Sequence, residues 1–157
     1  MSSYERYLIN DFNEPYLHSV NGELFKEIDS KQIFLKHFKQ KLFADNTLNI
    51  IVGTDSGLLV KYILQQQKIP GSRFLFIELP VLINSIIDQF GNNLDSDYIT
   101  ICTPDDWEQM AETANISVYI YKDKVKLFPS MGAKDAHIQD YHEFYNHVET
   151  QLRNQIF

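Results

Sequence analysis

The sequence predicts an α/β fold built on a mainly parallel sheet. Short apolar runs typical of buried strands alternate with helical segments through the middle of the chain. Each of these strands is followed by a helix, which is the crossover that parallel strands need. Glycines and prolines stand between the segments. Because such crossovers are right-handed and cover both faces of a sheet, we expect a Rossmann-like three-layer α/β/α sandwich, completed by a closing hairpin and a long C-terminal helix.

Length and charge narrow the class of protein. The 157 residues, 44% of them hydrophobic, suit one domain with one substantial core. The 21 acidic and 14 basic residues give a net charge of -7, which disfavours nucleic-acid binding. No apolar run is long enough to span a membrane, and the start MSSYERY does not resemble a secretory leader. We therefore expect a cytoplasmic protein that binds neither nucleic acid nor membrane.

The chain is predicted to have two parts. Residues 1–45 are expected to form an N-terminal appendage packed on the core, and residues 46–157 the Rossmann-like domain. In the appendage, Asn21 and Gly22 predict either a two-residue hairpin or a plain loop, since both residue types accept positive φ. Apolar residues at helical spacing then predict a helix over 31–43.

Aromatic side chains are dense near the N-terminus. Four of them precede any predicted core element: Tyr4, Tyr7, Phe12 and Tyr16. They either fold back onto the sheet or form a patch that docks another molecule. We expect them to fold back, because large aromatic surfaces are unfavourable in water.

Three pairs of a strand and a helix make up the centre of the chain. Strands are predicted over 48–53, 73–79 and 98–102, and helices over 56–68, 81–90 and 103–114. Pro80 suits the first turn of the second helix, where its missing N–H has no intrahelical partner to lose. Thr103 and the acidic residues that follow Pro104 are typical of a helix start.

The last part of the chain predicts the hairpin and the long helix. Residues 116–121 and 124–128 are strand-like, and Lys122 and Asp123 predict the turn between them. The lysines of this hairpin would share one face and protect an exposed edge from aggregation. A helix is predicted over 136–156 from its apolar stripe. Its histidines lie five residues apart, so no two share a face and no zinc site is expected: His137, His142 and His147.

One loop has the features of a ligand site. In an open parallel sheet, ligands bind beyond the carboxyl ends of the strands. The first such loop here is glycine-bounded, and Glu78 ends the next strand, where a carboxylate can accept from a ribose hydroxyl. The candidate ligand-binding residues are therefore Gly53, Thr54, Asp55, Ser56, Gly57 and Glu78. Asp55 disfavours a pyrophosphate and is more compatible with a cationic sulfonium ligand such as S-adenosylmethionine.

The same residues also have a purely structural interpretation. Both glycines then form a tight turn between strand and helix, Asp55 or Ser56 caps that helix, and Glu78 is a solvated strand end. The dinucleotide fingerprint and the P-loop are absent, and Cys102, the one cysteine, excludes a disulfide or a multi-cysteine metal site. We assign no catalytic residue, no metal ligand and no cofactor.

Three segments together resemble a known family. VGTDSGLLVKYI (52–63) is followed by GSRFLFIEL (71–79), and YLHSVNGELF (16–25) precedes both. This part of the chain is similar to the amino-terminal domain of the bacterial motility accessory factors, a flagellin glycosyltransferase family also described as pterin-pyrophosphokinase-like. The resemblance covers residues 16–90, and the turn at 54–56 departs from the more glycine-rich turn of many relatives.

The resemblance implies a role in flagellin glycosylation. In that family a small Rossmann-like domain precedes a larger central domain, to which the transfer of nonulosonic acid sugars to flagellin is attributed. This chain is too short to hold that central domain, so it is expected to correspond to the amino-terminal domain alone.

Three functions remain open on the sequence. The first is a non-catalytic domain that docks a protein partner, namely the transferase core, flagellin or a second copy. The second is an enzyme of methyltransferase type that binds S-adenosylmethionine or a nucleotide, supported by the glycine-bounded loop and Glu78. The third is an interaction module unrelated to motility, supported by the aromatic N-terminus. We expect the first, because the sequence offers no catalytic constellation.

Overall fold

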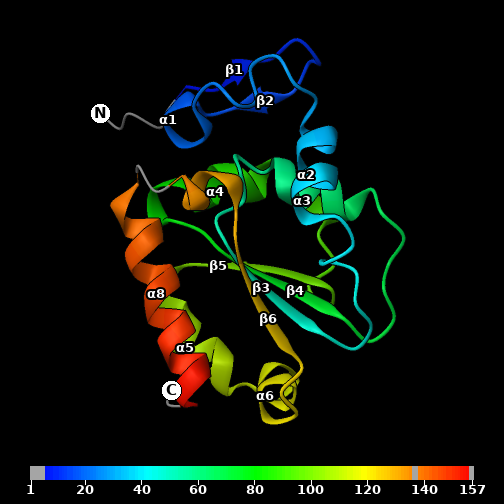
Figure 1. The fold of residues 1–157 in the computed structure, drawn as a ribbon, viewed down its shortest axis with the longest axis vertical. Helices are drawn as coiled ribbons and strands as arrows, with labels where there is room; N and C mark the ends of the chain where they lie inside the picture. Colours follow the sequence, from blue (N-terminus) through cyan, green and yellow to red (C-terminus); the bar gives the residue numbers. More distant parts are fainter. Residues whose placement is uncertain (1–5, 136–137, 156–157) are drawn as a thin grey trace.

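The structure, a computed structural model, describes residues 6–135 and 138–155. Within them, four strands form a parallel sheet: β3 (Leu48–Val52), β4 (Arg73–Ile77), β5 (Ile99–Cys102) and β6 (Val125–Pro129). Their order across the sheet is β5-β4-β3-β6 (Figure 1). The prediction of a Rossmann-like α/β/α sandwich is confirmed.

Helices cover both faces of this sheet. One face packs against α3 (Leu58–Leu64), α4 (Pro80–Asp88) and α2 (Ser30–Phe38), through buried residues that include Phe34, Tyr62 and Ile86. The other packs against α5 (Pro104–Glu112), α6 (Ala114–Tyr121) and α8 (Gln139–Asn154), around Trp107 and Val148. Side chains alternate between the two faces of a strand, so β3 contributes Ile51 to the first core and Leu48 and Ile50 to the second.

The order of the strands creates a topological switch point. From β3 the chain moves outward to β4 and β5, and it then returns across the opposite face to place β6 on the other side of β3. The connections that follow β3 and β6 therefore leave the sheet in different directions. Ligand crevices of open α/β sheets form at this point, beyond the carboxyl ends of the strands.

The predicted closing hairpin is wrong. Residues 116–121 belong to α6, a helix in which Ile116 is fully buried while Val118 and Tyr121 are exposed. Asp123 takes a φ of 57° where the chain leaves α6, so the Lys122-Asp123 pair ends a helix rather than joining two strands. The segment predicted over 124–128 is indeed a strand, but β6 pairs in parallel with β3.

The appendage contains small elements. Strands β1 (Leu8–Ile9) and β2 (Pro15–Tyr16) pair in antiparallel fashion, and α1 (His18–Asn21) follows them. Figure 1 shows these three elements together at one end of the molecule. Gly22 ends α1, so Asn21 and Gly22 do not form a two-residue hairpin. The helix predicted over 31–43 begins at Ser30 and already ends at Phe38.

The N-terminal aromatic residues fold back in part. Tyr16 is 2% exposed and belongs to the main core, and Tyr7 packs against that core and bonds through its hydroxyl to Ser85 of α4. Phe12 remains 50% exposed. Tyr4 lies outside the described residues. The expectation of folding back is thus confirmed for Tyr7 and Tyr16 and wrong for Phe12.

The structure adds two further short helices that the sequence did not predict, and it contains the long helix that was predicted over 136–156. The 3-10 helix η1 (Gly91–Asn93) follows α4, and the short helix α7 (Met131–Lys134) follows β6. The long C-terminal helix is confirmed as α8. Among the described residues, no helix is long and apolar enough to cross a membrane.

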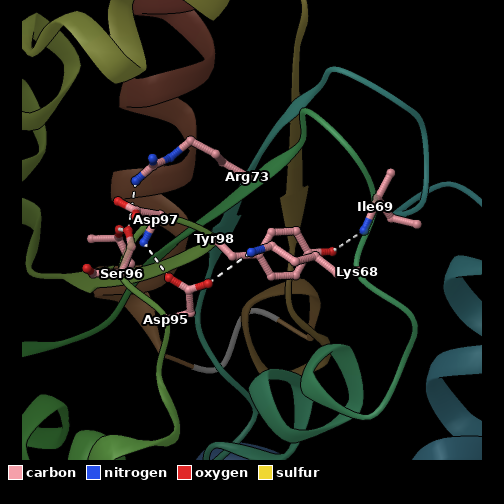
Figure 2. A network of polar contacts seen from close by, with 8 residues as sticks. Lys68, Ile69, Arg73, Asp95, Ser96, Asp97 and Tyr98 are labelled. Carbon is pink, nitrogen blue, oxygen red and sulfur yellow. Dashed lines mark hydrogen bonds and ion pairs between the residues drawn. The ribbon is translucent and has the colours of Figure 1, made fainter.

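A polar network, whose charged side chains bond at exposed sites, joins the loops at the amino ends of β4 and β5 (Figure 2). Lys68 lies 2.9 Å from a carboxylate oxygen of Asp95 and above the ring of Tyr98, and the Tyr98 hydroxyl accepts a bond from the Ile69 N–H. Arg73 donates to the carbonyl of Ser96. Because solvent screens such contacts, each contributes little stability.

Candidate functional site

The predicted site loop lies at the switch point. It follows β3, and the Ser130 N–H donates to the Val52 carbonyl at 2.9 Å, so the loop after β6 begins beside it. Glu78 follows β4 on the other side. The six candidate residues and the β6–α7 turn therefore meet at the carboxyl end of the sheet, as the rule for open α/β sheets requires.

The loop has a backbone that glycine makes possible. Gly53 has a φ of +90°, and a Cβ there would lie 2.1 Å from the hydroxyl of Ser130. The next turn is left-handed at Asp55 and Ser56, with φ of 52° and 61°, before Gly57 begins α3. This tight path turns the side chain of Asp55 into the molecule, where it is 0% exposed.

Asp55 accepts hydrogen bonds from two distant segments. Its Oδ1 accepts from the Gly132 N–H and from Nδ2 of Asn21, each at 2.8 Å. Its Oδ2 accepts from the Met131 N–H at 2.9 Å. The backbone donors are the first two residues of α7, the helix that follows β6, and the side-chain donor lies in α1. The carboxylate thus lies where the sheet opens, but the protein's own groups surround it.

Ser56 completes the link to the N-terminal appendage. Its hydroxyl donates to Oδ1 of Asn21 and accepts from the Leu17 N–H at 2.8 Å. Asn21 therefore bridges Asp55 and Ser56 with the two ends of its amide. As a result α1 and the residue before it cover the switch point directly.

Glu78 forms a second cluster beside the first. Its Oε2 accepts from the Thr54 N–H at 3.0 Å and from the Thr54 hydroxyl at 2.7 Å. Its Oε1 accepts from the Leu79 N–H at 2.8 Å and from the hydroxyl of Tyr141 in α8. Glu78 is 1% exposed. Its carboxylate ties the ends of β3 and β4 to the C-terminal helix.

Burial dominates the electrostatics of both carboxyl groups. It raises the pKa of Asp55 to about 6, and the negative charge of Glu78 adds to this rise, while the N–H donors oppose it. Burial also raises the pKa of Glu78, against the hydrogen bonds that its carboxylate accepts. Shifted pKa values are common in functional sites, but structural networks shift them as well.

The structural interpretation of the loop is right about the turn and wrong about its side chains. Gly57 is the N-cap of α3 and neither Asp55 nor Ser56 caps that helix. Glu78 is buried rather than solvated. The first N–H groups of α3 are also engaged, since Gly57 and Leu59 donate to Thr54 and Leu58 donates to the carbonyl of Asp55. These three N–H groups are therefore not available to an anion.

Sequence reasoning missed the partners of these residues. Four residues that bond to Asp55 or Glu78 lie far from the loop in sequence, and the sequence did not predict them near it: Asn21, Met131, Gly132 and Tyr141. A usable signal was present in the fourth strand. Had 124–128 been recognised as a parallel strand, the Ser130–Gly132 turn after it would have been placed at the switch point.

Other candidates remain outside the site. Burial raises the pKa of the Cys102 thiol to about 12, which keeps it protonated and unreactive. His142 is exposed, His147 pairs with Glu108 at the surface, and His137 lies outside the described residues. Within residues 6–135 and 138–155, no group of three His, Cys, Asp or Glu residues could hold a metal ion.

The comparisons with known proteins leave the family open. No protein-family model matches the chain, and no curated protein matches it. The function therefore has to be argued from the site and from the segments that carry the resemblance.

Proposed function

We propose that this chain is a non-catalytic, Rossmann-like docking domain of a motility-associated, flagellin-glycosylation factor. Its partner is the transferase core, flagellin or a second copy of the domain. One observation carries the non-catalytic part of the proposal: at the switch point, the chain's own groups engage the carboxylates of Asp55 and Glu78.

A ligand at this position would have to replace several internal bonds. Asp55 would lose the N–H donors of Met131 and Gly132, and α1 would have to move away from Ser56. Each buried group left without a partner costs about 1–3 kcal/mol. Such a cost disfavours both a nucleotide and S-adenosylmethionine at this site, and it supports a scaffold role for the network.

The resemblance supports the assignment to a motility factor. It rests on segments 16–25, 52–63 and 71–79. Each segment contributes to the buried clusters at the switch point. The first contributes Asn21, the second the loop that ends at Gly57, and the third Glu78. A shared sequence pattern in three separated segments is expected when those segments build one structural unit.

The first test asks whether a small molecule binds. Isothermal titration calorimetry of the full chain against nucleotide sugars, S-adenosylmethionine and NAD should give no heat of binding. Micromolar binding of any of them would overturn the non-catalytic role. In that case Glu78→Ala should abolish the heat, whereas Glu112→Ala, at an exposed position of α5, should leave it unchanged.

The second test asks whether a protein binds. Sedimentation velocity of the chain alone, with purified flagellin, and with a separately produced transferase core of the same family should reveal at least one micromolar complex. If neither self-association nor a complex with either protein forms, the docking role is wrong, whatever the calorimetry shows.

A further inference from the structure

A groove beside α2 offers a partner a large apolar hollow. It has a volume of about 600 Å³ and lies between the N-terminal appendage, α2 and the turn after β6. Its apolar residues are Leu24, Ile28, Ile33 and Met131. Ile28 is 45% exposed, so part of this apolar surface already faces solvent. We call this hollow the α2 groove.

The surroundings of the α2 groove are basic, although the chain as a whole is acidic. Lys36 and Lys39 of the α2 segment line it and are exposed. Burial lowers the pKa of His37, which also lines the groove, and the positive charges of Lys134 and Lys41 lower it further. Four of the 14 basic residues thus gather here, in a protein with a net charge of -7.

Acidic residues also lie near the α2 groove, but none of them lines it. Asp135 is the acidic group that raises the pKa of His37, against the two lysines and burial, which lower it. Asp29 is the N-cap of α2, at the other end of that helix from Lys36 and Lys39. The α2 groove therefore combines an apolar floor with charged side chains that are basic: Lys36 and Lys39.

The shape of this surface favours a peptide over a small molecule. A small-molecule site buries most of its ligand in a concave pocket. Here a second apolar side chain of α2, Leu35, lies outside the α2 groove and is 53% exposed, so a partner can contact apolar groups beyond the hollow. An amphipathic helix lays an apolar stripe along such a surface and can place acidic residues opposite flanking lysines.

We propose that the α2 groove docks an acidic amphipathic helix of a protein partner, with apolar anchors on Ile28, Ile33 and Met131 and carboxylates facing Lys36 and Lys39. This inference rests on the proposed docking function and names the surface that performs it. Charge complementarity selects the partner, because a basic helix would meet like charges at the rim.

Peptide selection tests the proposal and does not require that the partner be identified first. The full chain is presented to a library of random peptides long enough for several helical turns, and bound peptides are sequenced. We expect enrichment of peptides that carry Asp and Glu together with apolar residues at intervals of three and four. Fluorescence anisotropy then measures the affinity of an enriched peptide.

Charge-reversal variants locate the binding surface. The double variant Lys36→Glu, Lys39→Glu should weaken binding of the enriched peptide by about tenfold or more. The matched control Lys124→Glu, Lys126→Glu makes the same charge change at exposed positions at and beside β6 and should leave binding within about twofold. Ile28→Ser, which alters the apolar floor alone, should weaken binding as well.

Four results would overturn the inference. The first is enrichment of basic peptides, or of none. The second is an equal loss of affinity in both double variants, which would mean that binding follows net charge and not the α2 groove. The third is sedimentation with phosphatidylserine vesicles that Lys36→Glu, Lys39→Glu abolishes, which would make the surface a lipid site. Binding to flagellin or to the transferase core that survives this double variant would leave the docking function standing and reject the α2 groove.

Discussion

The same strand, β3, holds buried polar groups in two contrasting situations. At its carboxyl end, Asp55 and Ser56 are enclosed by donors and acceptors from α1 and the β6–α7 turn. In its middle, Asn49 is also 0% exposed, but neither Nδ2 nor Oδ1 of its amide has a hydrogen-bond partner among the described residues. Asn49 lies between Phe74 and Lys126 in the register of the sheet.

The difference shows what makes a buried polar group stabilising. A buried carboxylate that accepts several hydrogen bonds fixes the positions of every segment that donates to it. A buried amide without partners has lost its water and gained nothing in return. The carboxyl end of β3 therefore joins distant segments, whereas the middle of the same strand is destabilised by its one polar side chain.

Removing the Asp55 carboxylate should have the largest effect on stability. Asp55→Ala leaves the N–H groups of Met131 and Gly132 and the Asn21 amide without their acceptor, and we expect a loss of about 3 kcal/mol or more in the free energy of unfolding. Urea unfolding followed by the fluorescence of Trp107, the single tryptophan, measures it.

The control for this variant is an exposed aspartate. Asp45→Ala, in the loop before β3, should change the free energy of unfolding by less than about 0.5 kcal/mol. If Asp55→Ala is equally mild, the network at the switch point does not stabilise the fold.

The titration of Asp55 should make the stability of the fold depend on pH. The pKa of Asp55 is raised from 3.8 to about 6, so the folded state binds a proton more tightly than the unfolded state does. This contribution is fully present below the unfolded pKa and is lost as the pH rises through 6. The whole shift corresponds to about 3 kcal/mol, of which roughly half is lost between pH 5 and pH 7.

Comparison with Asp55→Asn isolates this contribution. The variant no longer titrates at position 55. It keeps Glu78, whose raised pKa also makes the fold less stable as the pH rises. Urea unfolding at pH 5 and pH 7 should therefore show a larger loss of stability with rising pH in the wild type than in Asp55→Asn. Equal slopes would contradict the assignment.

A methyl group at Gly53 should disturb the carboxyl end of β3, where the buried polar groups have hydrogen-bond partners. The φ of +90° is unfavourable for alanine, and the new Cβ would meet the Ser130 hydroxyl, which accepts a hydrogen bond from the Ala133 N–H at the start of α7. We expect Gly53→Ala to lower the free energy of unfolding by about 2–3 kcal/mol.

Gly91→Ala is the matched variant for the backbone effect alone. Gly91 has a φ of +53°, and a Cβ there would meet nothing within 4 Å. Its loss of stability should be about 1 kcal/mol. Thermal and urea unfolding of both variants compare them directly, and a loss at Gly53 no greater than at Gly91 would mean that Ser130 yields without cost.

A smaller effect, and one of opposite sign, is expected at Asn49. Asn49→Leu replaces the unpartnered amide with an apolar side chain of similar shape, and we expect the free energy of unfolding to rise by about 1–2 kcal/mol. Asn10→Leu is the contrasting variant. Asn10 is also buried, but it donates to Glu14 and the Phe25 carbonyl, so its replacement should destabilise. A loss at Asn49 would show that its amide has a partner in solution.

The fold could be predicted where strand and helix signals agree. Strands β3, β4 and β5 are apolar runs followed by helices with recognisable starts, and each was placed correctly. The error fell on 116–121, where β-branched and aromatic residues favour a strand locally. Packing decides otherwise, because Ile116 is buried while Val118, two residues later, is 41% exposed, and a strand would place both side chains on the same face.

The position of the candidate site could be predicted from the sequence. The hydrogen bonds that other parts of the chain make to its carboxylates could not. The rule for parallel sheets places the Gly53–Gly57 loop and Glu78 at one edge, and they lie there. It cannot reveal that Asn21 and Tyr141 reach the same edge, because those contacts depend on how the two ends of the chain pack. Local sequence patterns carry no information about such pairs.

The order of the strands has a consequence for the nascent chain. Synthesis proceeds from the N-terminus, so β3, β4 and β5 leave the ribosome before β6. Until β6 arrives, β3 has β4 on one side and an open edge on the other, and unpaired strand edges promote aggregation. The residues after β6 also supply the backbone N–H donors of Asp55, so the hydrogen bonds of this carboxylate are complete only once β6 has docked. The final docking of β6 is a long-range step, which makes it slow, and the edge of β3 is the surface that a chaperone would shield during translation.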